Sequence, residues 1–400
     1  MEVEKAYRNT LILAFLKNKT VNFVNIHSGI IALAEALIGI FIGVYLLQAG
    51  LFIWQIMFVW CLIFIVRLIF RPLTLHLIHR FGLRRVIILG TFNFLPIYAI
   101  LSQVSGLDGW LAAYIIYYAI NDTLYWLPFH TYFAAIGSNN DRGRHLSVRE
   151  AFTTLAGIIG PLLSAFIISF AGFQSVFSLA GGIAVLGMLP LFFTPDIDRP
   201  TYISVKDAWQ SVDRRGFVFF LGYGWIFMGS FVIWSLIVFE VAGDLLVFGG
   251  LFTLAAFAQM IGGFAAGHFI DAGHTKLLYR LAILAVFIMP LVRALFSTSV
   301  PAIVVLEICI AIALGFVLPI LNTVFYNLSR NSSNSLYFQY FAETGWDVGS
   351  IIITVIAAGI SYFGFDLRWG IAATVLGVPI VAYILWQYYE VEHHSLISKS

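Results

Sequence analysis

The chain is a succession of long apolar segments, each close to the roughly 20 residues that a helix needs to cross a membrane. Glycine, proline and short charged clusters separate these segments. Only 10% of the 400 residues are charged, against about 25% in an average soluble protein. These features predict an all-α membrane protein with no soluble catalytic domain. The net charge of +2 gives no indication of a nucleic-acid partner.

Breaks in the apolar pattern divide the chain into twelve predicted transmembrane helices. A polar stretch rich in proline and charge separates the sixth span from the seventh. We expect an N-terminal six-helix bundle over 1–194, a cytoplasmic linker over 195–216 and a C-terminal six-helix bundle over 217–400. A short interfacial helix is expected at 5–18. The spans are predicted at 22–48, 52–78, 86–104, 109–136, 148–170, 174–194, 217–242, 245–270, 277–296, 301–329, 337–362 and 367–389.

Basic residues concentrate in alternate connections between these spans. Arg84 and Arg85 lie in one such connection, whereas the connections near 49–51 and 105–109 contain no lysine or arginine. Because cytoplasmic connections are enriched in lysine and arginine, the basic connections are predicted to face the cytoplasm. An even number of spans puts both termini on one side. We therefore expect a multi-pass protein of the cell membrane (inner or plasma membrane) with both termini cytoplasmic.

Several short motifs recur in the second half of the chain in the same register as in the first. The offset between the copies is about 192 residues, the size of one predicted six-span unit. Matches in one register over a whole half are typical of two parallel repeats. The matching pairs are Leu127-Pro128 with Leu318-Pro319, Glu150 with Glu343, and Gly172-Phe173 with Gly364-Phe365.

The connection after the eighth predicted span joins a glycine, an acid and a basic cluster in one short motif. The connection after the second span keeps the basic cluster, but Leu75 and His79 replace the glycine and the acid. The motif and the two six-span repeats resemble the major facilitator superfamily. The two motifs comprise Gly267, Asp271, Gly273 and Lys276 in the second half, and His79, Arg80, Gly82, Arg84 and Arg85 in the first.

The resemblance implies two pseudo-symmetric six-helix bundles that move a solute by alternating access. In that family this connection helps to latch the cytoplasmic gate. We therefore expect the connection after span two to meet the start of span eleven, and the connection after span eight to meet the start of span five. A role for the arginines in membrane orientation alone is the alternative. The expected contacts set His79 and Arg80 against Glu343 and Asp347, and Asp271 against Arg149. Contact of Glu343 and Asp347 with the substrate is the alternative for these two acids.

Predicted span five contains Gly160-Pro161 within a run of small residues. The run resembles, in degraded form, a motif of the drug/proton antiporters of that family. Small residues also permit close helix packing, which explains the run equally well. The motif therefore favours export without deciding it.

Acidic side chains stand at the midpoints of two predicted spans. Glu35 lies in span one, and Asp122 follows Asn121 in span four. A charged group at this depth is costly unless it faces a cavity or a partner, so it usually serves function. In the resembled fold these spans line the central cavity, which makes both acids candidates for proton coupling. Arg67 in span two could neutralise either, and hydrogen bonding to neighbouring spans is the structural alternative.

Aromatic side chains share a face of span four with Asp122 at helical spacing. Tyr118, Tyr125 and Phe129 form this group. Such a wall suits a flat, lipophilic or cationic solute through stacking and cation–π contacts. Helix packing and anchoring at the membrane interface are the alternative.

These observations predict a secondary active transporter, and we favour proton-coupled export of a small amphipathic or cationic compound. A proton-coupled uptake symporter for a small nutrient, or a transporter-like protein without transport activity, are the alternatives. We expect no enzymatic activity, because no nucleophile or histidine set is clustered at one depth. We expect no cofactor and no metal site. The expected partners are the solute, protons and the lipid bilayer, and the protein is expected to be a monomer.

Overall fold

The computed structural model describes residues 18–136, 142–197 and 201–392, apart from the side chains of 142–147, 271 and 392. The interfacial helix expected at 5–18 lies outside these residues, except for Asn18. Within the described residues every regular element is helical, which confirms the all-α class.

Long helices joined by short turns make up the first half of the chain. Gly82 alone separates two of them, and its φ of 88° lies in the left-handed region that glycine adopts without strain. Asp108 caps another by accepting a hydrogen bond from the amide of Leu111 at 2.8 Å. The elements are α2 (Lys19–Ile38), α3 (Phe41–Gln48), α4 (Ile53–Phe81), α5 (Leu83–Leu101), α6 (Gly109–Ala135), α7 (Arg142–Leu186) and α8 (Met188–Phe192).

The second half follows the same pattern, with three departures from α-helical geometry, the last of which is the π-helical stretch η3. A π-helical stretch, η1, follows α10, and a 3₁₀ stretch, η2, follows α16. The elements are α9 (Val205–Ser211), α10 (Arg215–Met228), η1 (Gly229–Ile233), α11 (Trp234–Ala242), α12 (Leu245–Asp271), α13 (Thr275–Phe296), α14 (Val300–Asn331), α15 (Ser335–Tyr362), α16 (Arg368–Ala372), η2 (Ala373–Gly377), α17 (Val378–Trp386) and η3 (Gln387–Glu392).

Among the described residues, 10 helical segments are long and apolar enough to cross a membrane. The segment Val148–Phe192 has 45 residues, and at 1.5 Å per residue it measures about 68 Å, more than twice the thickness of a bilayer core. Gly172 breaks it, with φ 76° and ψ 170°. The helix α6 is not among the 10 segments. A multi-pass helical protein is therefore confirmed, and the count of twelve stays a prediction.

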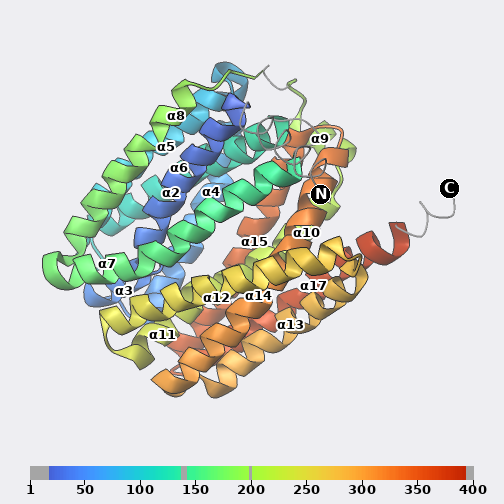
Figure 1. Ribbon diagram of the computed structural model, residues 1–400. Helices are drawn as coiled ribbons and strands as arrows, with labels where there is room; N and C mark the ends of the chain where they lie inside the picture. The colour runs from blue at the N-terminus through green and yellow to red at the C-terminus, as the bar shows by residue number, and fades with distance from the viewer. Residues whose placement is uncertain (1–17, 137–141, 198–200, 393–400) are drawn as a thin grey trace, which may run out of the picture.

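The helices pack mainly with others of their own half of the chain. In Figure 1 the blue-to-green helices of the first half lie on one side and the yellow-to-red helices of the second half on the other. The pair α2 and α7 and the pair α10 and α15 make the most extensive contacts. Contacts between the halves come chiefly from α4 with α15 and from α7 with α12.

Two glycines bring α15 very close to α10. A Cβ atom on Gly345 would lie 2.2 Å from the carbonyl oxygen of Phe217, and one on Gly349 would lie 1.9 Å from that of Leu221. Since real Cβ atoms do not approach so closely, only glycine permits this packing. The contact fixes the position of α15, which carries two of the acids considered below.

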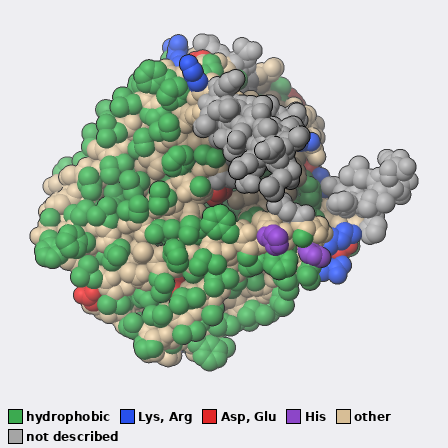
Figure 2. All heavy atoms as spheres, viewed as in Figure 1, with side chains coloured by type: hydrophobic (Ala, Val, Ile, Leu, Met, Phe, Trp, Pro, Cys, Tyr) green, Lys and Arg blue, Asp and Glu red, His purple; other side chains and the backbone are tan. Residues whose placement is uncertain are grey.

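One end of the molecule holds the connection between α8 and α10, and we call it the linker end. Tyr132, near the end of α6, donates a hydrogen bond to the carbonyl of Pro195 at 2.6 Å. In Figure 2 apolar side chains are spread over the visible face, and lysine and arginine side chains lie at its margins. An apolar belt with charge at its edges is typical of a protein surrounded by lipid.

Candidate functional site

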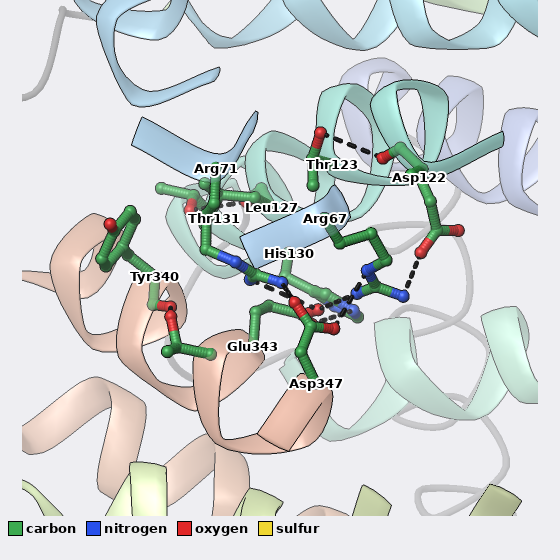
Figure 3. A network of polar contacts seen from close by, with 12 residues as sticks. Arg67, Arg71, Asp122, Thr123, Leu127, His130, Thr131, Tyr340, Glu343 and Asp347 are labelled. Carbon is green, nitrogen blue, oxygen red and sulfur yellow. Dashed lines mark hydrogen bonds and ion pairs between the residues drawn. The ribbon is translucent and has the colours of Figure 1, made fainter. Parts of the chain in front are cut away.

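Five charged side chains meet inside the molecule where α4, α6 and α15 pack together (Figure 3). Arg67 and Arg71 are one helical turn apart on α4, and Glu343 and Asp347 are one turn apart on α15. Asp122 projects from α6. The exposed fractions of these five side chains run from 0% to 12%, so the charges are buried.

Arg67 is the centre of this cluster. Its Nη1 contacts Asp122, its Nη2 donates to Oε2 of Glu343 at 3.0 Å, and its Nε lies 3.0 Å from Oδ1 of Asp347. The flat, forked guanidinium group can serve several carboxylates at once in this way. Asp122 belongs to the first half of the chain, whereas Glu343 and Asp347 belong to the second. One side chain therefore ties the two halves together.

The cluster holds more negative than positive charge. Arg71 pairs with Asp347 and lies 3.8 Å from Glu343, and His130 lies 3.9 Å from Glu343 on the other side. With a neutral His130, two guanidinium groups face three carboxylates, which leaves one surplus negative charge if all are ionised. A buried uncompensated charge is costly. The cluster therefore favours the uptake of one proton or of one further cation.

Arg67 and Asp122 lie halfway along α4 and α6. Arg67 is 14 residues from each end of Ile53–Phe81, and Asp122 is 13 residues from each end of Gly109–Ala135. At 1.5 Å per residue, both stand about 20 Å from the helix ends. Helices of this length that cross a bilayer place these charges near its middle.

Glu35 stands close to this cluster without belonging to it. Asp122 and Arg149 are near enough to interact electrostatically with the Glu35 carboxylate. Among the described residues, no hydrogen bond or ion pair is formed by that carboxylate. Of the two acids that Arg67 was expected to neutralise, Asp122 has it as a partner and Glu35 does not.

The aromatic residues of α6 are engaged mostly in packing. The rings of Tyr125 and Phe129 are stacked with centroids 5.4 Å apart, and both residues are buried. The hydroxyl of Tyr125 lies 3.1 Å from Nε2 of His27. Tyr118 is half-buried and meets the ring of Trp60 edge-on at 5.6 Å. Asn121 is buried on the same helix, and its side-chain oxygen has no partner among the described residues.

Comparison with known proteins identifies the family. The model of the Major Facilitator Superfamily matches residues 24–354. The chain belongs to this superfamily. The chain is similar in fold to the solved structure of the E. coli fucose:proton symporter, with 14% sequence identity, a TM-score of 0.64, and coverage of 92% of this chain and 98% of that chain. No curated protein matches the sequence.

The superfamily motif of the first half does not make the contact that the sequence predicted. His79 and Arg80 were expected opposite Glu343 and Asp347, but Nε2 of His79 lies 3.3 Å from the hydroxyl of Tyr337. Arg80 instead lies over the ring of Phe81 at 5.3 Å.

The reason for the difference is the register of two antiparallel helices. The start of α15 lies against the end of α4, so that His79 meets Tyr337 and Arg71 meets Glu343 one and a half to two turns deeper. Because α15 begins at Ser335, Glu343 is not at its first turn. The prediction placed the acids about two turns too close to the linker end.

The remaining first-half motif residues contact the linker. Arg84 donates to the carbonyl of Thr194, and Nε of Arg85 lies 3.9 Å from Asp196. A Cβ on Gly82 would lie 3.1 Å from the carboxylate of Asp196. The superfamily motif here therefore fastens the linker to the first half.

The second-half motif is described only in part. Lys276 lies 3.7 Å from Glu390, and a Cβ on Gly267 or Gly273 would meet nothing within 4 Å. The side chain of Asp271 is outside the described residues, so its pairing with Arg149 stays a prediction. Arg149 itself donates to the hydroxyl of Tyr326 on α14 at 2.9 Å, which is a contact between the two halves.

The small residues of predicted span five do serve close packing. A Cβ on Gly160 would lie 2.6 Å from Cβ of Ala36, so α7 and α2 touch at this point. Near Pro161, the Thr253 hydroxyl of α12 donates to the carbonyl of Ile158 at 2.9 Å and accepts from the amide of Leu162 at 3.2 Å. That hydroxyl stands between two backbone groups that would otherwise pair within α7.

Four of the five clustered charges are site residues predicted from the sequence, and Arg71 is the fifth. The signal was present, since Arg71 follows Arg67 by one helical turn. Its side chain is 2% exposed and therefore lies inside the cluster. His130 was likewise not assigned a place beside Glu343.

Proposed function

We propose that this superfamily transporter moves a small solute by alternating access and couples that movement to protons. In this proposal α6 and both parts of α7 cross the membrane, which gives twelve spans in two six-helix bundles over residues 1–194 and 217–400. The linker end and both termini face the cytoplasm, in agreement with the basic residues near that end.

The observation that carries the proposal is the position of Arg67 between an acid of its own half and two acids of the other half. A proton on Asp122 removes one of the three negative charges that hold the guanidinium. Arg67 then pairs only with Glu343 and Asp347, which strengthens the contact between the halves. Loss of the proton returns Arg67 toward Asp122 and weakens that contact. Protonation thereby shifts the balance between conformations.

Glu35 supplies a second carboxylate, near the middle of the segment Lys19–Gln48. It stands within electrostatic reach of Asp122 and has no basic partner among the described residues. We propose that Glu35 and Asp122 are the two groups that accept protons or the charged part of the solute. Since like charges nearby disfavour double ionisation, a proton on one acid makes ionisation of the other easier.

The surplus of carboxylates favours a solute that carries positive charge or is neutral over an anion. Tyr118 lies one helical turn before Asp122 on α6, and its ring meets that of Trp60 on α4. The two rings provide aromatic surface for such a solute. We therefore propose proton-coupled export of a small amphipathic or cationic compound.

The test uses purified protein in liposomes that contain a pH-sensitive dye. Addition of a lipophilic cation, tetraphenylphosphonium, is expected to move protons across the liposome membrane, and so to change the luminal pH, only when the protein is present. Asp122→Asn and Glu35→Gln are expected to abolish this proton movement. Glu240→Gln is the matched control, because Glu240 is an exposed acid at the far end of α11. Full proton movement in both site variants would contradict the proposal.

A further inference from the structure

Two buried polar atoms of the first half have no hydrogen-bond partner among the residues that the structure describes. They are Nε1 of Trp60 on α4 and the hydroxyl of Tyr114 on α6. Trp60 is 5% exposed and Tyr114 is 0% exposed. Buried tryptophan and tyrosine side chains usually do find a partner, because an unpaired polar group away from water is costly. The two atoms therefore need a partner that these residues do not supply.

Matched side chains elsewhere in the molecule do have such partners. Tyr132, also on α6 and also 0% exposed, donates to the carbonyl of Pro195. Trp234, which is 1% exposed, donates from Nε1 to the carboxylate of Glu307. Burial of the ring is common to both tyrosines and both tryptophans. The missing partner is therefore a property of the place where Trp60 and Tyr114 lie.

That place is the packing between α4 and α6, on the side of the charged cluster remote from the linker end. Trp60 precedes Arg67 by two turns on α4. Tyr114 likewise precedes Asp122 by two turns on α6. The ring of Tyr118 meets that of Trp60 edge-on and lies near that of Tyr114, with centroids 5.6 Å apart in both pairs. The three aromatic side chains therefore form one group.

The group continues to Asp122. Tyr114, Tyr118 and Asp122 follow one another at four-residue intervals, which places them on one face of α6. Helix side chains lean toward the N-terminus of their helix, so Asp122 leans toward Tyr118. Both tyrosine hydroxyls are near enough to interact electrostatically with the Asp122 carboxylate. Other ionisable groups adjoin this face: Arg67, which contacts Asp122, and Glu35 and Tyr98, which are near enough to interact with Tyr118.

We propose that Trp60 and Tyr114 hold an internal water, and that this water and the hydroxyl of Tyr118 carry protons between Asp122 and the end of the molecule remote from the linker end. A water suits the site because the indole N–H can only donate, whereas the phenol can donate and accept. Buried waters typically make about three hydrogen bonds to polar groups that lack other partners. The inference rests on the proton exchange at Asp122 proposed above and adds the route.

The transfer makes and breaks only O–H bonds. A proton from the solution at that end adds to the water, which passes one of its other protons to the oxygen of Tyr118. The hydroxyl of Tyr118 gives its own proton to a carboxylate oxygen of Asp122 at the same time, so the phenol stays neutral. The carboxylate gains the single proton that the solution loses. Tyr114 is a positioning residue, because it holds the water and passes no proton itself.

The first test detects the water and needs no transport. Brief X-ray irradiation of the purified full-length protein splits bound water, and the hydroxyl radicals oxidise the side chain beside it. Mass spectrometry then measures the oxidation rate of each residue. Trp60 and Tyr114 are expected to be oxidised several-fold faster than their buried counterparts, Trp234 and Tyr132. Equal rates within each pair would overturn the proposal, since no water would then lie beside Trp60 and Tyr114.

The second test removes one partner of the water. Tyr114→Phe deletes the hydroxyl and keeps the ring. We expect the oxidation rate of Trp60 and the rate of proton movement in the liposome test each to fall about threefold to tenfold, the equivalent of one hydrogen bond. Counterflow of tetraphenylphosphonium, which needs no net proton movement, is expected to fall less than proton movement does. Tyr117→Phe is the matched control, because Tyr117 lies on the same helix and is 44% exposed.

The outcomes distinguish the water route from the proposed function. Unchanged proton movement in Tyr114→Phe, with Asp122→Asn inactive, would overturn the route and leave Asp122 as the proton acceptor. Equal losses of counterflow and proton movement would give Tyr114 a structural role only and would also overturn the route. If the parent protein moves no protons, the proposed function fails and the route fails with it, whereas the oxidation rates still decide whether water is bound.

Discussion

Nη2 of Arg67 on α4 donates a hydrogen bond to Oε2 of Glu343 on α15 at 3.0 Å. The two residues are 276 positions apart in the chain, and the contact joins its two halves in a buried environment. A charge pair in such a place is strong while both partners are present and costly when one is lost. The first two predictions follow from this asymmetry.

Removal of the guanidinium should destabilise the protein through the acids that it leaves behind. Arg67→Gln is expected to lower the free energy of unfolding by about 3–5 kcal/mol, because Asp122, Glu343 and Asp347 then face Arg71 alone. Addition of Asp122→Asn should recover part of this loss, with a coupling energy of about 0.5–3 kcal/mol. Thermal or denaturant unfolding in detergent measures both. Arg85→Gln, at an exposed arginine, serves as the control. Strictly additive losses for Arg67→Gln and Asp122→Asn would show that the two side chains do not act together.

Neutralisation of Glu343 should favour the state that is open at the linker end. Glu343→Gln keeps the size of the side chain but removes the charge that attracts Arg67 and Arg71 across the halves. The measurement is the distance between spin labels at Ala135→Cys, at the end of α6, and Asn331→Cys, at the end of α14, with Cys61 and Cys309 replaced by serine. We expect the population of molecules with a long distance between the two labels to rise several-fold. Glu343→Asp, which keeps the charge, should lie closer to the parent. A fall in that population with Glu343→Gln would mean that the acid holds the linker end apart.

The proposed orientation predicts labelling from opposite sides of the membrane. Lys206→Cys lies in the linker on α9, and Leu107→Cys lies in the exposed turn before α6. In intact cells an impermeant thiol reagent should label position 107 and leave position 206 unlabelled until the membrane is permeabilised. Leu107 is preferable to its neighbour Gly106, whose φ of 149° disfavours any side chain. Labelling of position 206 from outside would reverse the topology.

The close approach of α15 to α10 predicts opposite effects for two substitutions on one helix. Gly349→Ala places a methyl group 1.9 Å from the carbonyl oxygen of Leu221 and should lower the free energy of unfolding by about 1–3 kcal/mol. In Gly359→Ala the same methyl group meets nothing within 4 Å, and the better helix propensity of alanine should leave stability unchanged or raise it by up to about 1 kcal/mol. Melting temperatures of the purified variants distinguish the two. Equal effects at both positions would show that α15 and α10 are not in contact at Gly349.

Local sequence pattern was sufficient to predict where these helices begin and end. The predicted span 109–136 corresponds to Gly109–Ala135, and 337–362 corresponds to Ser335–Tyr362. Such boundaries are predictable because a break in the apolar run or a capping residue such as Asp108 acts on its own segment. Glu35 and Asp122 could be found in the same way, since a charge within an apolar run is visible without knowledge of its neighbours.

The partners of those charges depended on how the helices pack. The sequence placed His79 opposite Glu343, but the structure pairs His79 with Tyr337 and brings Arg67 and Arg71 to the acids of α15. A displacement of about two turns between these antiparallel helices changes every pair along them. No local pattern records that displacement. Here it is set by steric contact, such as that of Gly345 and Gly349 against the backbone of α10. The sequence by itself determined which segments are helical and which of them carry charge, because these are properties of single segments. Only the tertiary structure decided which charges meet, because that depends on the position of one helix along another.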